Sequence, residues 1–142
     1  MIRVLTITIL VFPVFLGGFI YIIFRTEKLI MFRWFEYLNL ANEINTIKSF
    51  GNTFSFPDWF IYNLPDGLWV FSYTAISLEI WRNSITQHRI FWILIIPIAA
   101  ILSELLQLLK IISGTFDFAD IVSYLLGITL PIYLLKKFNS KI

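Results

Sequence analysis

A chain of 142 residues that is 58% hydrophobic, 18% aromatic and only 14% charged has little surface suited to water, whereas a soluble domain carries about 25% charged residues. The absence of cysteine excludes disulfides and thiolate metal sites, and the single histidine, His88, excludes a multi-histidine cluster. A net charge of only +2, from scattered basic residues, argues against nucleic acid as a partner. We therefore expect one membrane domain over residues 1–142, with the lipid bilayer as its surroundings.

The first predicted element is a membrane span over residues 4–24, which carry no charge between Arg3 and Arg25. A helix of this length rises about 31 Å, which is enough to cross a bilayer. The apolar run is too long for a signal peptide, and no small-x-small cleavage site precedes Arg25. We interpret the segment as a membrane anchor.

Residues 25–64 form a predicted extracytoplasmic loop with two parts. The stretch 28–40 is apolar, with Arg33 and Glu36 one helical turn apart. We expect it to continue the first helix or to lie in the membrane interface as an amphipathic helix. Residues 41–58 are polar and rich in turn-forming residues, which predicts an extramembrane loop.

Three further spans are predicted over residues 65–82, 90–109 and 117–135. The expected fold class is therefore all-α, a polytopic bundle of four transmembrane helices with an additional interfacial helix. Basic residues flank the loop between the second and third spans and fill the C-terminal tail. Because short basic loops stay in the cytoplasm, we expect a multi-pass protein of the cell membrane with both termini cytoplasmic.

Acidic side chains gather near one end of this predicted bundle. Glu104 and Gln107 share a face near the end of the third span, and Asp117 and Asp120 share a face at the start of the fourth. The short connection makes these spans antiparallel neighbours, so Glu104 and Asp120 reach comparable depth. Asp66 opens the second span at the same end. Acids in membrane segments usually face the protein interior and are functional, so we expect one outward-facing polar pocket.

Some pocket residues have a purely structural explanation. Asp117 fits a helix N-cap, and the helix dipole favours the negative charge of Asp120. Glu104 lies toward the C-terminus of its helix, where it needs a proton, a contact with Lys110, or a divalent cation such as magnesium or calcium. No ligand spacing is diagnostic, so no cofactor is expected, with a divalent cation as the alternative. The predicted pocket residues are Asp66, Trp69, Tyr73, Glu104, Gln107, Asp117, Asp120 and Tyr124.

Three stretches carry a family resemblance: "SELLQ" in the third span, "GTFDFADIVSYLLG" at the start of the fourth, and "LPDGLWVFSY" at the start of the second. Through them the chain, over about residues 64–135, resembles the VanZ-like family of small membrane proteins. In that family a Glu and a Gln close one helix, and an Asp pair followed by a polar residue and a glycine opens the next. The matching positions here are Glu104, Gln107, Asp117, Asp120, Tyr124 and Gly127, with Asp66 in the earlier helix. Thr115 stands near the point where the family usually has an arginine.

The resemblance implies an envelope role in a bacterial cytoplasmic membrane, and the founding members are linked to tolerance of glycopeptide antibiotics. It implies no particular biochemical activity. The expected function is a non-enzymatic envelope protein whose outward pocket holds the helices together or binds a lipid head group or peptide-like ligand. One alternative is a metal-assisted enzyme acting on a polyprenyl or phospholipid head group. Another is a small subunit that packs on a membrane-protein partner. Small size and the lack of an evident nucleophile favour the first and the last.

Overall fold

The computed structural model describes residues 2–26, 29–51, 53–81 and 86–139. Within these ranges the regular secondary structure is entirely α-helical, which confirms the all-α class. The helices are α1 (Ile2–Phe24), α2 (Ile30–Tyr37), α3 (Ala41–Gly51), α4 (Asp58–Tyr62), α5 (Leu64–Ile80), α6 (Gln87–Leu108) and α7 (Phe118–Asn139). The expected end of the second span at Arg82 lies outside the described residues.

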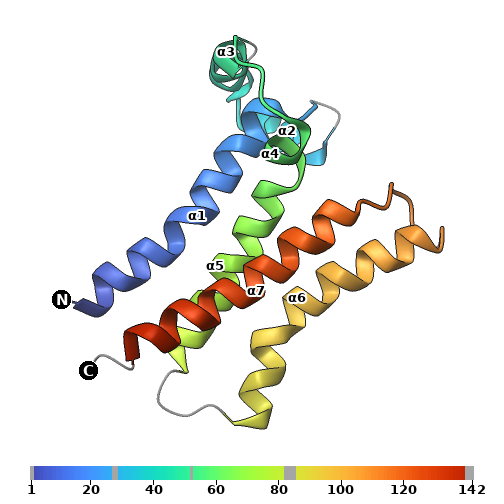
Figure 1. The fold of residues 1–142 in the computed structure, drawn as a ribbon. Helices are drawn as coiled ribbons and strands as arrows, with labels where there is room; N and C mark the ends of the chain where they lie inside the picture. Colours follow the sequence, from blue (N-terminus) through green and yellow to red (C-terminus); the bar gives the residue numbers. More distant parts are fainter. Residues whose placement is uncertain (1, 27–28, 52, 82–85, 140–142) are drawn as a thin grey trace.

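Four long helices, α1, α5, α6 and α7, make up the body of the molecule (Figure 1). Helix α5 is central, because α1, α6 and α7 all contact it. Helices α2, α3 and α4 gather at one end, and we call these three helices the cap. The α6–α7 turn points toward this end, whereas α1 begins and α7 ends at the opposite end (Figure 1).

The long helices coincide within a few residues with the ranges expected for the four spans. Helix α6 is the described helix that is long and apolar enough to cross a membrane. The described apolar stretches Leu10–Phe24 and Phe118–Leu134 are shorter, and α5 has 17 residues. By this criterion one helix qualifies, and the four-span arrangement stays a prediction. Proline at position 97 removes one backbone donor from α6, and this helix bends midway along its length (Figure 1).

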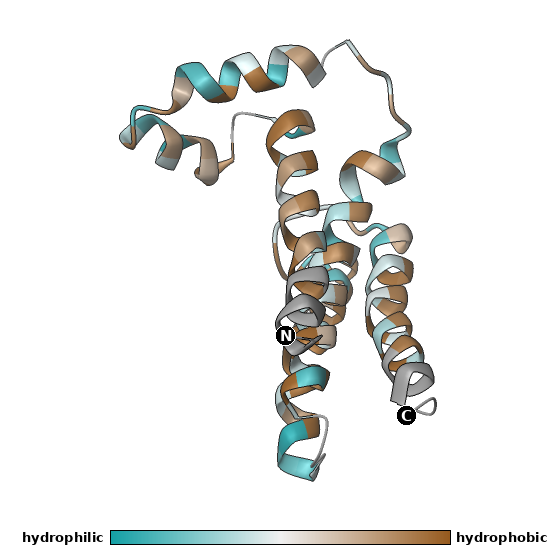
Figure 2. Ribbon diagram, turned by 90° about the vertical axis from the view of Figure 1, so that its left-hand side faces the viewer, coloured by the Kyte–Doolittle hydropathy of each residue, from teal (hydrophilic) through white to brown (hydrophobic). Residues whose placement is uncertain are grey.

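The cap corrects the expectation of an extended polar loop over residues 41–58. Residues 30–37 are helical as expected, but Ala41–Gly51 form a second helix, α3. It lies across the direction of the long helices (Figure 2). Thr46 and Ser49 turn their hydroxyls back onto backbone carbonyls one turn earlier, so these polar residues are accommodated within a helix. Lys48 donates to the carbonyl of Arg25 at 2.8 Å and thereby caps the end of α1.

Helices α5 and α7 approach each other at their backbones. A Cβ added at Gly127 would lie 2.8 Å from the carbonyl oxygen of Gly67, and one added at Gly67 would lie 3.1 Å from Ser123. Only glycine permits this separation, and small residues at helix crossings are typical of membrane bundles. On α7, Asp120, Ser123 and Gly127 recur at helical spacing, so the face that packs on α5 begins with an aspartate.

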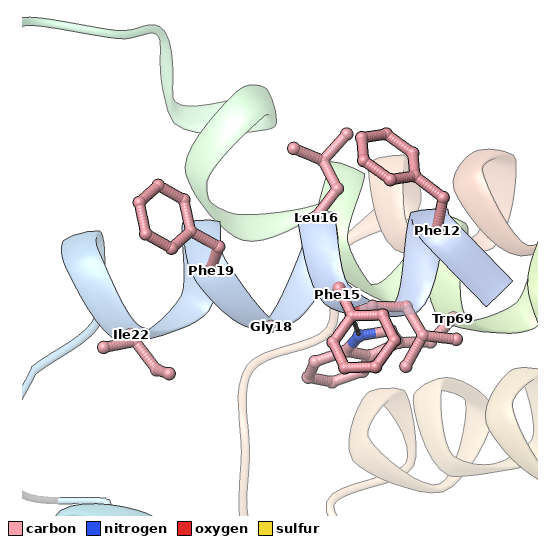
Figure 3. A pocket seen from close by; sticks show the side chains of 8 residues that line it. Phe12, Phe15, Leu16, Gly18, Phe19, Ile22 and Trp69 are labelled. Carbon is pink, nitrogen blue, oxygen red and sulfur yellow. Dashed lines mark hydrogen bonds between the residues drawn. The ribbon is translucent and has the colours of Figure 1, made fainter.

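Helix α1 packs on α5 through a large side chain instead. The Trp69 indole donates to the carbonyl of Val14 at 3.2 Å and contacts the Tyr21 ring at 5.3 Å. Figure 3 shows Trp69 on one side of α1, while Phe12, Leu16 and Phe19 project from the other side. Two apolar grooves of about 710 and 490 Å³ border this helix. The α1 side of α5 is therefore more open than the α7 side.

Candidate functional site

Three helix ends meet at the cap end of the bundle and carry the candidate site. Asn63 and Asp66 lie at the start of α5, Glu104 near the end of α6, and Asp117 and Asp120 at the start of α7. Helix α6 closes with Lys110 in the left-handed conformation, at a φ of 57°, and the short turn that follows leads directly into α7. We call these five side chains, together with Arg25, the carboxylate cluster.

Asn63 is the centre of this cluster. Its side-chain nitrogen donates one hydrogen bond to Oδ2 of Asp117 and another to Oδ1 of Asp120, both at 2.8 Å. Only 4% of Asn63 is exposed, so the amide joins α5 to α7 away from solvent. One buried amide thus supplies donors to two carboxylates, and each of these bonds is charge-assisted.

Glu104 ties the end of α6 to the start of α7. Its Oε2 atom accepts the backbone N–H of Asp117, and its Oε1 atom accepts the side chain of Gln107, both at 3.3 Å. Glu104 is 4% exposed, so it faces the bundle and not the surroundings. Gly114, at a φ of 145°, passes so close to Gln107 that an added Cβ would lie 2.3 Å from the amide oxygen. The turn therefore fixes the glutamine that bonds Glu104.

Arg25, from the end of α1, is the cation of the cluster. Its Nη2 atom lies 3.9 Å from Oδ2 of Asp66 and donates to the carbonyl of Tyr62 at 3.4 Å. The guanidinium sits over the rings of Tyr21 and Tyr62, at 5.0 and 4.7 Å from their centroids. Asp66 is also within electrostatic range of Asp120. The ion pair is loose, and Arg25 is held mainly by the two aromatic rings.

Asp117 is a helix cap, as the sequence indicates. Its Oδ1 atom accepts the backbone N–H of Ala119 at 2.8 Å. The hydrogen bond from Asn63, followed by that from Ala119, lowers the pKa of the Asp117 carboxyl below its usual value. Asp117 is exposed and lies in the turn before α7, so it is ionised at neutral pH.

The structure brings together most, but not all, of the predicted pocket residues. Tyr124 is buried, with 7% exposure, and its hydroxyl is within electrostatic range of Asp66, Asp120 and Glu104. Trp69 instead contacts α1, as described above. The hydroxyl of Tyr73 donates to the carbonyl of Trp92 in the first half of α6. These two side chains stabilise helix packing at a distance from the turn that holds the acids.

Two members of the cluster are missing from the sequence prediction. Asn63 lies two residues before the predicted second span, where an asparagine suggests a cap, yet its side chain makes no cap hydrogen bond. Arg25 ends the charge-free run of the first span. If the first and second spans are antiparallel neighbours, Arg25 and Asp66 fall at the same depth. Counting depth across both spans would therefore have found this pair.

The chemistry available at the cluster is dominated by acceptors. The donors to its four carboxylates are the guanidinium of Arg25, the side-chain amides of Asn63 and Gln107, and two backbone N–H groups, those of Asp117 and Ala119. In the part of the chain that the structure describes, no three His, Asp or Glu side chains are arranged to hold a metal ion. Lys110, a candidate partner of Glu104, is exposed, and Glu104 instead accepts from Asp117 and Gln107. A ligand that suits this site therefore carries N–H or O–H donors, or a positive charge.

Comparison of the chain with family models, with curated proteins and with solved structures gives no significant match. What the structure defines on its own is a class, an all-α protein with at least one helix able to cross a membrane. The resemblance to the VanZ-like family stays a prediction, and the function must be argued from the geometry of the cluster.

Proposed function

We propose that this chain is a multi-pass envelope protein of the VanZ-like type that binds a donor-bearing ligand at its carboxylate cluster. In this proposal α1, α5, α6 and α7 are the four spans, both termini are cytoplasmic, and the cap with the cluster faces outward. The ligand is an ammonium or amide group of a lipid head group or peptide-like envelope molecule. Binding, not catalysis, is the proposed activity.

The surface of the long helices supports the membrane placement. Only 17% of the apolar window of α6 is buried within the molecule, whereas the core helix of a soluble protein is mostly buried. Phe12 and Phe15 of α1 are 63% and 71% exposed. Such surface needs a hydrocarbon environment or a partner. Arg89 at the start of α6 and Lys136 near the end of α7 lie at the end opposite the cap, in keeping with a cytoplasmic location there.

The observation that carries the ligand proposal is the imbalance between acceptors and donors in the cluster. Asn63 serves two aspartates at once, and the Arg25–Asp66 pair is loose at 3.9 Å. Tyr124 is buried and within electrostatic range of three of the acids. A carboxylate has two oxygens and accepts several hydrogen bonds, whereas Asp120 accepts one side-chain bond and Asp66 has only the loose ion pair, so a ligand that brings donors would gain binding energy here.

The family resemblance supports the same site. Where the VanZ-like pattern usually has an arginine just ahead of the aspartates, this chain has Thr115. In the structure the guanidinium comes from Arg25 at the end of α1, a region outside the resemblance. A cation beside the acids is therefore retained, but a different helix supplies it.

Topology can be tested with single cysteines, because the chain has none of its own. Ser113→Cys lies in the exposed α6–α7 turn, and Gln87→Cys lies at the exposed start of α6. We expect a membrane-impermeant maleimide to label Ser113→Cys in intact cells and Gln87→Cys only after lysis. Labelling of both from outside, or the reverse order, would contradict the proposed orientation.

The ligand site is tested with Asp66→Asn and Asp120→Asn, which remove charge but keep side-chain size. The matched control is Asp58→Asn, an exposed acid at the start of α4. We expect the two cluster variants to unfold within a few degrees of wild type, yet to lose protection in a cell challenged with an envelope-directed antibiotic. Full protection by both variants would remove the ligand role, and loss of protection together with loss of folding would leave a structural role alone.

A further inference from the structure

The smaller apolar groove differs from a plain lipid-facing surface because it has walls on several sides. It encloses about 490 Å³ between the cap half of α1, the segment that joins α3 to α4, and the start of α5. Six of its lining residues are Ile20, Phe24, Phe50, Phe56, Phe60 and Leu64. The groove is therefore long in the direction of α1 and ends at the cap.

The aromatic wall of this groove is fixed by its own packing. Phe56 stacks on Phe60 at 4.6 Å between ring centroids and meets Phe24 edge-on at 5.4 Å. Gly51 at the end of α3 seats against α1, because a Cβ there would lie 2.0 Å from Cγ2 of Ile23. These contacts hold the α3–α4 segment against α1 and form one wall of the groove.

Positive charge stands at the cap end of the groove. Arg25 directly follows Phe24, and the Lys48 ammonium lies 2.8 Å from the Arg25 carbonyl. The Arg25 side chain is 25% exposed, and its polar contacts with Tyr62 and Asp66, at 3.4 and 3.9 Å, are long. Its Nε atom is buried and has no hydrogen-bond partner among the described residues. The Nη end of the guanidinium, which is partly exposed and makes only long polar contacts, is suited to a phosphate.

We propose that the groove binds one phospholipid, with an acyl chain along α1 and the phosphate at Arg25 and Lys48. An apolar groove with two cations next to its cap end matches a phosphate ester of a hydrocarbon chain. A second protein chain would have to supply an apolar segment and an anion at the same point. The proposal rests on the membrane placement proposed above, but not on a ligand at the carboxylates. Arg25 links the two sites, since its other side faces Asp66.

The test measures how much defined phospholipid stays bound. Wild-type protein in mild detergent is titrated with dioleoyl phosphatidylglycerol and examined by native mass spectrometry, alongside dioleoylglycerol, which has the same chains and no phosphate. We expect one phospholipid per chain and about tenfold weaker retention of dioleoylglycerol. Equal retention of the two molecules would overturn the assignment of Arg25 to the phosphate, without any mutation that might affect folding.

Two pairs of matched variants locate the lipid. Phe50→Ala removes a ring that lines the groove. Its control, Phe12→Ala, removes a similarly exposed ring on α1 that does not line this groove. Arg25→Gln removes the cation at the mouth, and Arg33→Gln removes an exposed cation of α2. We expect about tenfold loss of phospholipid retention in the first member of each pair only. If the two members of each pair retain phospholipid equally, the proposal is overturned. The proposed carboxylate site is judged separately, and it would still stand if Asp66→Asn and Asp120→Asn lose protection.

Discussion

The two helices that flank α5 pack on it differently, although each brings a glycine close to α5: Gly127 on α7, and Gly17 on α1, where an added Cβ would lie 2.8 Å from the Trp69 indole nitrogen and 3.1 Å from the Pro65 carbonyl oxygen. On the α7 side, Gly127 and Gly67 let the two backbones approach until no Cβ would fit between them. On the α1 side, the Trp69 indole stands between the helices and donates to Val14. The first interface has no room for an occupant, whereas the second leaves grooves of about 710 and 490 Å³ beside it.

This difference explains why the polar network and the grooves lie where they do. Backbone contact permits only one register between α5 and α7, and that register places Asp120 beside Asn63. A network of buried polar groups needs such fixed geometry, because each hydrogen bond is sensitive to distance and direction. A contact through a large side chain leaves volume on either side of it, which suits the binding of a flexible hydrocarbon chain.

The largest effect is expected at Asn63, where the tight interface meets the carboxylates. Asn63→Ala removes both 2.8 Å bonds and leaves two aspartates without their shared donor. We expect a loss of about 3 kcal/mol in unfolding free energy, since bonds to charged groups contribute about 1.5–3 kcal/mol each. The measurement is unfolding of the purified protein in detergent. The control is Asn45→Ala, which changes an exposed asparagine of α3. If Asn45→Ala lowers the unfolding free energy as much as Asn63→Ala does, the two bonds from Asn63 to the aspartates do not stabilise the fold.

Two glycine substitutions compare the α5–α7 interface with a face of α1 that has no close neighbour. Gly127→Ala places a methyl group 2.8 Å from the Gly67 carbonyl, so overpacking should cost about 2 kcal/mol. Gly18→Ala on α1 has no neighbouring atom within 4 Å, so it should be neutral or stabilise by up to about 0.5 kcal/mol through helix propensity. Thermal unfolding of the two variants in the same detergent gives the answer. If Gly127→Ala is as stable as Gly18→Ala, the backbone contact between α5 and α7 is not as close as described.

A smaller effect is expected at the joint between α3 and α1. Gly51→Ala forces Ile23 or the end of α3 to move, because the added Cβ would lie 2.0 Å from a branched side chain. The cap is peripheral, so we expect a loss of only about 1 kcal/mol in stability. The α3–α4 segment should nevertheless be cleaved faster in limited proteolysis, and phospholipid retention should fall. Unchanged cleavage would mean that the α3–α1 contact does not hold this segment in place.

The main features of the fold and part of the candidate site could be predicted from the sequence. Charge-free apolar runs indicate where the long helices lie, because a helix in hydrocarbon cannot carry unpaired charge. The expected proximity of Glu104 and Asp120 came from counting residues away from one shared turn. The rise of a helix and the short α6–α7 connection are enough to predict that these two side chains lie at similar depth. In the structure Glu104 contacts Asp117, and Asp117 and Asp120 share Asn63.

What the sequence did not reveal depends on contacts between distant segments. Arg25 joins the cluster only because α1 packs beside α5, and nothing local in the sequence states which helices are neighbours. Helix α3 was missed because Asn42, Asn45, Thr46 and Ser49 suggest turns. The half-buried residues of α3 include Ala41, Ile44, Ile47 and Lys48. These positions are three, four or seven residues apart, a helical spacing that could have indicated a helix.

The smallest predicted effect concerns pH and Asp117, the acid that lies in the turn before α7. Its pKa is lowered by Asn63 and then by the N–H of Ala119, so this carboxyl contributes stability that is complete above its unfolded pKa of about 3.9. That contribution is lost as the pH falls through the lowered folded pKa. Asp117→Asn keeps an oxygen for Ala119, but it places an amide against the amide of Asn63.

We therefore expect wild type to unfold only about 1 °C above Asp117→Asn at neutral pH, because the group is exposed and screened by solvent. The difference should shrink as the pH falls below about 4 and vanish once the lowered folded pKa has been passed. Melting curves of both proteins across this range, with Asp58→Asn as the control for an acid outside the cluster, measure it. A difference that grows on acidification would show that Asp117 is destabilised by its neighbours, and the proposed donation by Asn63 would then be wrong.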